Sequence, residues 1–153
     1  MPDMNIRKAA FADAPDLVRL HTRSVLELCR NDYSSEQLQY WVSHSTLEKY
    51  QLRLKRHPSY IAERDGKMIG YVRWNPETNE LSSIFVDPEY VRQGVATALM
   101  EVAYQDAISK GVKDLWLFAS LTAVPFYQAI GWHCEERKMR GELECVKMSK
   151  HLA

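Results

Sequence analysis

The sequence has few cysteines and no pattern that would use them. Its three cysteines, Cys29, Cys134 and Cys145, are odd in number, and their spacing matches neither a disulfide framework nor a zinc-ligand motif. We expect them to be reduced and mostly buried thiols. The five histidines show no HExxH or paired-ligand pattern, so the sequence predicts no metal site.

The sequence also lacks an excess charge of either sign and a long apolar run. Twenty basic and twenty acidic side chains give a formal net charge of zero, which argues against a nucleic-acid or membrane-surface partner. The start MPDMNIRKAAF has no apolar signal core, and no stretch of about 18 consecutive apolar residues occurs. We therefore expect a cytoplasmic protein whose partner is a small molecule.

The 153 residues are 46% hydrophobic, enough to bury one substantial core. No linker, repeat or low-complexity run divides them, so we expect residues 1–153 to form a single domain. The chain begins with a short predicted strand over residues 4–10. Asp13 then offers a carboxylate N-cap to an amphipathic helix that should end near Cys29.

Two short helices are predicted next. SSEQLQYW carries a capping box from Ser34 to Gln37, and a second box runs from Ser45 to Glu48. These helices form a candidate lid or substrate wall, because they carry Tyr40 and Trp41 without lengthening a sheet. The alternative is that both aromatic side chains only pack the inserted segment.

The middle of the chain predicts three antiparallel strands. SYIAE and KMIGYVRW flank Asp65-Gly66, a dipeptide that tolerates the positive φ angles of a tight hairpin turn. After a second turn at NPETNE, the run ELSSIFVDP reads as a third strand that ends at Pro88.

The last part of the chain alternates helices and strands. A helix is predicted over residues 94–110, with Gly111 as its left-handed C-cap. VKDLWLFA reads as a strand that is buried on both faces and pairs in parallel. SLTAVPFYQAIG predicts a short helix, and WHCEERKM and GELECVKM predict two final strands. The pattern as a whole indicates a mixed α/β sheet.

The junction PEYVRQGVATALMEVA, residues 88–103, is the strongest candidate binding motif. Main-chain N–H groups in the first turn of a helix have no intrahelical partner, and with the helix dipole they form a site for an anion such as phosphate. Gly94 lets the chain approach that anion closely. The motif is neither a Walker loop nor a GxGxxG fingerprint, so a nucleotide triphosphatase is not expected.

Two separated motifs resemble the GNAT superfamily of acyl-CoA-dependent N-acyltransferases. The motif Arg/Gln-x-x-Gly-x-Gly/Ala falls on Val91–Ala96, and the signature Phe-Tyr-x-x-x-Gly-aromatic falls on Phe126–Trp132. The order and spacing of the predicted elements match from about Ile6 to Met148. VDPEYVRQGVATALM and ASLTAVPFY are similar in particular to small bacterial YafP-like members. Val91 stands where the family usually has Arg or Gln, a departure that should weaken phosphate binding without abolishing it.

This resemblance implies the fold and the cofactor site. The fold would be a single α/β domain with a mixed, mostly antiparallel sheet flanked by helices, whose strands splay to admit acetyl-CoA. Main-chain groups of one strand would pair with the pantetheine arm, and the loop and helix start would hold the pyrophosphate. Ser120 stands where many relatives place an Asn that contacts the cofactor. The predicted cofactor-binding residues are Ile84, Phe85, Val86, Arg92, Gln93, Gly94, Val95, Ala96, Thr97, Ser120 and Phe126.

The resemblance also implies the reaction: transfer of an acetyl group to a primary amine by direct attack in a ternary complex, with no metal. Tyr127 takes the place of the general acid, since a phenol with a pKa near 10 stays protonated at neutral pH. Its alternative is a packing role in an aromatic cluster. Glu80 is the predicted general base, acting through water, and His21 and Glu63 compete for that role.

The acceptor would be a small-molecule, peptide or protein amine, and nothing in the sequence specifies which. Arg140–Leu143 could form a charged wall for an acidic or polar acceptor, or simply a turn. Arg73 and Trp74 could likewise line the acceptor cleft or only cover the sheet. Two other functions stay open, a non-catalytic acyl-CoA-binding sensor and a toxin-like relative that acylates aminoacyl-tRNA. Exposed strand edges in such a sheet allow a homodimer.

Overall fold

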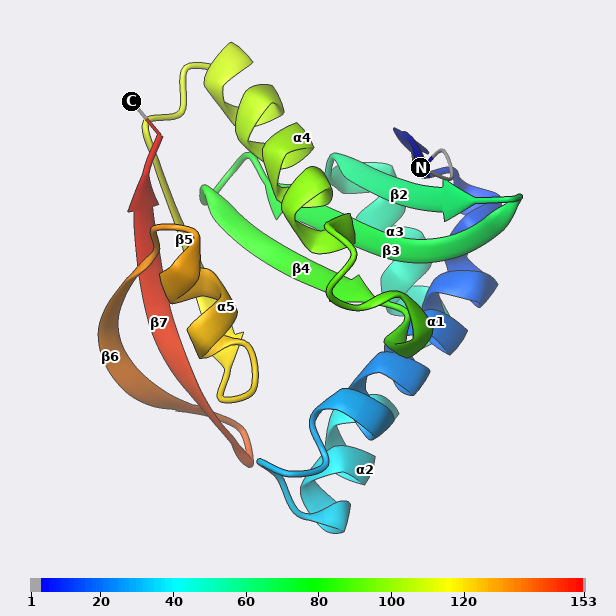
Figure 1. Cartoon of the computed structure of the whole chain (residues 1–153), viewed down its shortest axis with the longest axis vertical. Helices are drawn as coiled ribbons and strands as arrows, with labels where there is room; N and C mark the ends of the chain where they lie inside the picture. Colours follow the sequence, from blue (N-terminus) through cyan, green and yellow to red (C-terminus); the bar gives the residue numbers. More distant parts are fainter. Residues whose placement is uncertain (1–3, 153) are drawn as a thin grey trace.

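A computed structural model describes residues 4–152 (Figure 1). Seven strands form one sheet in the order β1-β2-β3-β4-β5-β7-β6, and every neighbouring pair except β4 and β5 is antiparallel. The strands are β1 (Met4–Lys8), β2 (Ser59–Arg64), β3 (Lys67–Asn75), β4 (Glu80–Val86), β5 (Asp114–Ser120), β6 (His133–Arg140) and β7 (Leu143–His151). This is the mixed, mostly antiparallel α/β sheet that the sequence predicts.

Helices cover both faces of the sheet. They are α1 (Ala14–Leu28), α2 (Ser35–Ser43), α3 (Leu47–Arg56), α4 (Val95–Ser109) and α5 (Val124–Ala129), with short 3-10 turns at Phe11–Asp13 and Pro88–Tyr90. Apolar residues of α4 pack with β3, β4 and β5 in the larger core, whereas α1 and α3 pack on the opposite face against Ile61, Tyr71 and Phe85.

Strands β4 and β5 meet at one end and diverge at the other (Figure 1). Glu80 and Trp116 are their one pair in register, supported by a 3.2 Å hydrogen bond from the Trp116 N–H to the Asn79 carbonyl. The parallel pairing predicted for β5 is therefore confirmed but short. Its burial alternates instead of covering both faces, because Trp116 and Phe118 point out of the core. The divergence leaves the rest of the β4 edge unpaired with β5.

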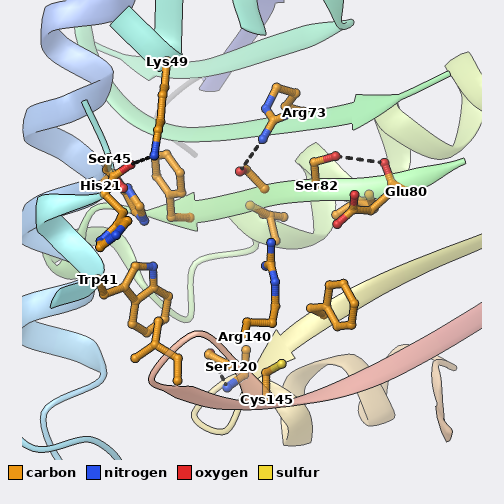
Figure 2. Close-up of a pocket in the computed structure, with 18 of the residues that line it drawn as sticks. His21, Trp41, Ser45, Lys49, Arg73, Glu80, Ser82, Ser120, Arg140 and Cys145 are labelled. Atoms are coloured by element: carbon orange, nitrogen blue, oxygen red, sulfur yellow. Dashed lines mark hydrogen bonds between the residues drawn. The ribbon is translucent and has the colours of Figure 1, made fainter. Parts of the chain in front are cut away.

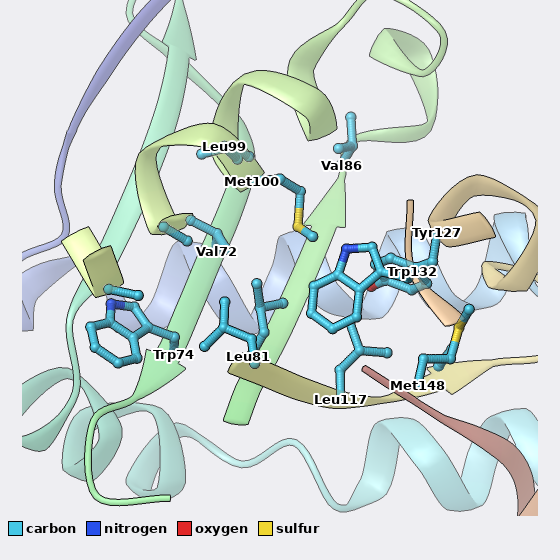
Figure 3. Close-up of a cluster of buried hydrophobic side chains, with 14 of the residues drawn as sticks. Val72, Trp74, Leu81, Val86, Leu99, Met100, Leu117, Tyr127, Trp132 and Met148 are labelled. Carbon is cyan, nitrogen blue, oxygen red and sulfur yellow. The ribbon is translucent and has the colours of Figure 1, made fainter. Parts of the chain in front are cut away.

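The larger core fixes the end of β4 and the aromatic residues beside it. Figure 3 shows Val72, Leu99 and Met100 close to β4, with Trp132 and Tyr127 continuing the cluster toward α5. Each such side chain contributes about 1.5–3 kcal/mol on burial. Glycine at position 70 brings α4 close to β3, because a Cβ there would lie 2.8 Å from Leu99 Cδ1. The core therefore holds the start of α4 beside β4.

Most predicted turns and caps are confirmed, and two are wrong. Asp65 and Gly66 have φ angles of 52° and 74° at the predicted hairpin turn, and the Ser34–Gln37 capping box is present at the start of α2. Asp13 does not cap α1 with its side chain, because Arg7 on β1 binds that carboxylate at 2.8 Å. Thr46, not Ser45, is the N-cap of α3, and its hydroxyl accepts a hydrogen bond from the Lys49 N–H.

All three cysteines are free thiols; Cys29 and Cys145 are buried and Cys134 is exposed. Among residues 4–152, no helix is long and apolar enough to cross a membrane. The same residues contain no group of three or more His, Cys, Asp or Glu side chains that could hold a metal ion.

Candidate active site

Two cavities open where β4 and β5 diverge. The first, called the α4 cavity, has a volume of about 760 Å³ and lies between the end of β4, the start of α4, and residues of α1 and α5. Its lining is mostly apolar and includes Val25 and Leu28 from α1, Val86 at the end of β4, and Phe126 from α5. A mostly apolar lining suits a ligand with an apolar arm.

The start of α4 supplies the polar end of this cavity. Gly94 is its N-cap with a φ angle of 80°, and Arg92, two residues earlier, also has a positive φ of 61°. The first intrahelical bond runs from the Ala98 N–H to the Gly94 carbonyl at 3.0 Å, so the three preceding N–H groups have no helical partner. A Cβ added at Gly94 would meet no atom within 4 Å. The space beside these donors is therefore open to an anion.

Ten of the eleven residues predicted to bind the cofactor line the α4 cavity. The exception is Gln93, whose side-chain carbonyl accepts a 2.7 Å hydrogen bond from Arg64 and which does not line the cavity. Val91 lies in the lining. Cavity residues that the sequence did not single out, such as Tyr90 and Thr122, flank the two motifs, and their position beside those motifs is the only signal that could have found them.

The second cavity, called the α3 cavity, has a volume of about 720 Å³ (Figure 2). Helices α2 and α3, strands β3 and β4, and the turn between β6 and β7 surround it. Of the residues predicted for the acceptor side or the base, those that line it are His21, Tyr40, Trp41, Arg73, Glu80, Arg140, Gly141 and Leu143.

Two of the predicted alternatives lie elsewhere. Glu63 on β2 forms an ion pair with Arg7 at 3.1 Å and lines neither cavity. Trp74 is fully buried on the α4 face of the sheet, where its Nε1–H donates to Asp106 at 2.8 Å. Arg73 and Trp74, adjacent in sequence, thus point to opposite faces of β3, and only Arg73 reaches a cavity.

Tyr127 lies where the two cavities meet. It lines both, together with His21, Trp41, Ile84, Phe85, Ser120 and Ala123. Only 6% of Tyr127 is exposed, and its ring contacts Phe126 and Trp132 edge to face at centroid distances of 5.4 and 5.9 Å. The aromatic cluster and the cavity position therefore coexist. Burial, with a smaller contribution from Tyr104, raises the pKa of Tyr127 well above its usual value, so the phenol keeps its proton at neutral pH.

His21 forms part of the wall shared by the cavities. Its ring stacks on Phe85 with a centroid distance of 4.6 Å, and its Nδ1 is buried without a hydrogen-bond partner. Burial, and secondarily the nearby Arg53, lowers the pKa of His21 to about 4. The imidazole is consequently neutral at pH 7, but it is a weak base.

Two residues at the start of α2, Tyr33 just before it and Gln37 within it, connect the wall of the α3 cavity to β7 and to the turn that joins β6 to β7. The Tyr33 hydroxyl donates to the Glu144 carbonyl at 2.6 Å and accepts from the Leu121 N–H at 2.9 Å. Gln37 Nε2 donates to the Glu142 carbonyl at 3.3 Å. A Cβ at Gly141 would overlap the Tyr40 hydroxyl, so this turn fits closely against α2. The two short helices therefore form part of the wall of this cavity, and their role toward a substrate stays a prediction.

Helix α3 brings basic residues to the α3 cavity that sequence reasoning missed. Lys49 and Arg53 line it from α3, and His57 follows directly after the helix. In the sequence these residues look like the solvated face of an amphipathic helix. No motif marks them, because only the packing of α3 beside β3 turns them toward the cavity.

Residues 29–152 match the family model of the acetyltransferase (GNAT) domain. The chain therefore belongs to the GNAT family and is an acetyltransferase, as the sequence resemblance implies. It is 26% identical over 145 residues to the uncharacterized N-acetyltransferase YafP of Escherichia coli K12, an alignment that covers 95% of this chain and 89% of that protein.

Solved structures agree with this assignment. A GCN5-related N-acetyltransferase from Rhodopseudomonas palustris has a TM-score of 0.92 at 27% identity, covering 99% of this chain and 97% of that one. The PaiA N-acetyltransferase from Thermoplasma acidophilum, solved in complex with coenzyme A, has a TM-score of 0.86 at 22% identity, covering 97% and 99% of the two chains.

Proposed function

We propose that this acetyltransferase transfers an acetyl group from acetyl-CoA to a primary amine by direct attack while both substrates are bound. The observation that carries the proposal is the meeting of the two cavities at Tyr127. One cavity has free main-chain donors at a helix start, and the other has polar walls. A donor and an acceptor that enter from opposite sides would meet beside the phenol.

The α4 cavity fits coenzyme A. The N–H groups of Val95, Ala96 and Thr97 would hold the pyrophosphate, and the side chain of Arg92 lies on the same cavity. The β4 edge near Ile84–Val86, unpaired with β5, offers main-chain groups to the amides of the pantetheine arm. Coenzyme A supplies the acetyl group as a thioester.

The chemistry needs few protein groups. The amine nitrogen attacks the thioester carbonyl carbon, the carbon–nitrogen bond forms, and the carbon–sulfur bond breaks. The N–H of Val86 would stabilise the oxyanion that develops. Tyr127 would donate its proton to the departing thiolate, which contributes about 10²- to 10⁴-fold to the rate. None of the three thiols is required as a nucleophile.

Glu80 is the proposed base that removes a proton from the ammonium form of the acceptor. It lies at the start of β4 and lines the α3 cavity. His21 is a weaker candidate, because its pKa of about 4 makes it a poor proton acceptor. Glu63 is not proposed, since it lines neither cavity.

The test combines calorimetry with a thiol-release assay over a panel of amines. Wild-type protein should bind acetyl-CoA and turn over, and Tyr127→Phe should lower kcat by at least about 100-fold while the Kd for acetyl-CoA stays unchanged. Tyr90→Phe, which changes another tyrosine of the α4 cavity, is the matched control. Equal turnover in wild type and Tyr127→Phe would remove the acid assignment. Acetyl-CoA binding without turnover of any amine would support a non-catalytic binding module instead.

A further inference from the structure

The α3 cavity gathers buried polar atoms that have no partner. Within residues 4–152, four buried side-chain atoms make no hydrogen bond: His21 Nδ1, Tyr50 Oη, Arg64 Nε and Arg73 Nε. Three of the four residues line this cavity. A buried polar atom without a partner costs about 1–3 kcal/mol. Such atoms concentrated in one cavity indicate that a ligand supplies the missing partner.

Arg73 is the most costly of these groups. Only 6% of it is exposed, and burial lowers its pKa from the usual value. Its guanidinium donates to His57 Nδ1 at 3.0 Å and to Ser83 Oγ at 3.3 Å, and both acceptors are formally neutral. The carboxylate of Glu80 favours the charge from a distance but lies too far away to form an ion pair within 4 Å. A buried cation whose partners are neutral is strongly stabilised by an incoming anion.

The cavity as a whole is basic although the chain is neutral. Four permanent cations line it, Lys49, Arg53, Arg73 and Arg140, and none of them forms a salt bridge with another described residue. Its two carboxylates belong to Glu80 and Glu144, and Arg137 binds the second at 2.8 Å. In Figure 2, Arg73 and Arg140 reach toward β4 from opposite sides of the cavity.

We infer that the acceptor is an amine that also carries an anionic group, a carboxylate or a phosphate, and that Arg73 binds this group with help from Tyr50 and Arg53. The inference rests on the proposed acetyl transfer. A guanidinium that is already held in place matches either anion through paired N–H donors.

The register of the sheet limits the size of the acceptor. Arg73 pairs with Ser83 on β4, and Ser83 lies three residues before Val86, about 10 Å along a strand. The anionic group of the acceptor should therefore lie within about 10 Å of the reacting nitrogen. An amino acid or a short aminoalkyl acid satisfies this limit, whereas a polyamine, which is a polycation at pH 7, has no anionic group for these cations to bind.

The experiment compares acceptors that differ only in the anionic group. Amino acids of increasing length are assayed beside their carboxamides and beside aminoalkylphosphonates, with thiol release as the readout. We expect kcat/KM to be at least about tenfold higher for an acid than for its amide, as for a hydrogen bond to a charged group. The phosphonate arm tells carboxylate and phosphate recognition apart.

Variants of the cavity residues test whether Arg73 and Tyr50 cause the preference for acids over amides. Arg73→Gln should lower kcat/KM for the preferred acid by about 100-fold and for the matching amide by less than threefold. Tyr50→Phe, which removes only a hydroxyl without a partner, should lower it about fivefold for the acid alone. Arg19→Gln is the control, because Arg19 lies on an exposed part of α1 beside Asp16. Tyr50→Phe keeps the test valid if Arg73→Gln does not fold.

A binding measurement separates this inference from the proposed reaction. Calorimetry with coenzyme A present compares an N-acetylated acid with its N-acetylated amide, in wild type and Arg73→Gln. Binding of the acid that depends on Arg73 supports the anion site even if no amine is acetylated. Equal use of acids and amides by an active enzyme, or unchanged acid selectivity in both variants, would overturn the inference and leave acetyl transfer standing.

Discussion

The α4 cavity and the α3 cavity differ in how the chain builds them. The polar end of the α4 cavity comes from one continuous stretch, the loop and first turn of α4, and its main donors are N–H groups of the backbone. The α3 cavity draws side chains from α1, α2, α3, β3, β4 and the turn before β7. A main-chain site depends on backbone conformation, so it can keep its ligand while many side chains change. A site made of scattered side chains depends on the identity of each of them, so it can set specificity.

The largest predicted effect is on the pH dependence of stability, and it comes from His21 in the wall that both cavities share. The pKa of His21 is about 4 in the folded protein and about 6.5 in the unfolded chain. His21 should therefore lower the free energy of unfolding in acid. Between these values the unfolded state binds more protons, so stability rises with pH in this window. The loss from pH 6.5 to 4 should reach about 3 kcal/mol.

Denaturant unfolding of His21→Leu across this range is the measurement. The variant should show a shallower fall in unfolding free energy than wild type. His133→Leu, on the exposed strand β6, serves as the control. A slope in His21→Leu as steep as in wild type would mean that the shared wall is not the origin of the acid sensitivity.

The next prediction separates backbone strain from ligand binding at the α4 cavity. Gly94 and Gly111 flank α4 with φ angles of 80° and 81°, and a Cβ added at either would meet no atom within 4 Å. Gly94→Ala and Gly111→Ala should therefore each lower stability by about 1–2 kcal/mol. Only Gly94→Ala should also weaken acetyl-CoA binding, by about 30-fold, as for one lost hydrogen bond to a charged group. Calorimetry that finds equal affinities in the two variants would argue against the helix start as the phosphate site.

On the acceptor side, Glu80→Gln should lower kcat/KM by about tenfold at pH 7 with an unchanged Kd for acetyl-CoA. The loss should shrink as the pH rises, because an amine with a pKa near 10 then loses its proton without a base. Glu77→Gln, in the exposed turn before β4, is the matched variant. A defect that stays constant from pH 7 to 9.5 would point to binding rather than proton removal.

The smallest effect is expected at the cap of α2. Ser34→Ala removes the hydroxyl that accepts the Gln37 N–H at 3.1 Å and should lower the unfolding free energy by about 1 kcal/mol. Ser35→Ala, one residue later on an exposed helix position, should have little effect. Since α2 lines the α3 cavity, KM for the acceptor should rise in Ser34→Ala while acetyl-CoA affinity does not change. A change in acetyl-CoA affinity alone would contradict the separation of the two cavities.

The difference between a site built from one stretch of chain and a site built from distant elements also explains which features the sequence could predict. The hairpin at Asp65-Gly66 and the capping box at Ser34 depend on residues a few positions apart, and both are confirmed. The cap at Asp13 is wrong because Arg7 of a neighbouring strand takes the carboxylate. Strand β5 is buried on one face only, because Trp116 and Phe118 point out of the core.

The residues of the predicted site also divide into local ones, which the sequence identifies, and non-local ones, which it does not. Residues near Gly94 are contiguous, so one motif places all of them except Gln93 on one cavity. Lys49, Tyr50 and Arg53 carry no motif, and no local rule shows that they face Arg73 from another element. Non-local packing decides those contacts, and a single sequence does not record it.

The single register pair between β4 and β5 has a mechanical consequence. The two halves of the sheet form a V whose apex is at Glu80 and Trp116. Any change in the angle of this V displaces its open ends, where the coenzyme would enter, far more than its apex. The carboxylate proposed as the base is therefore anchored at the point that moves least when the enzyme widens or narrows around its substrates.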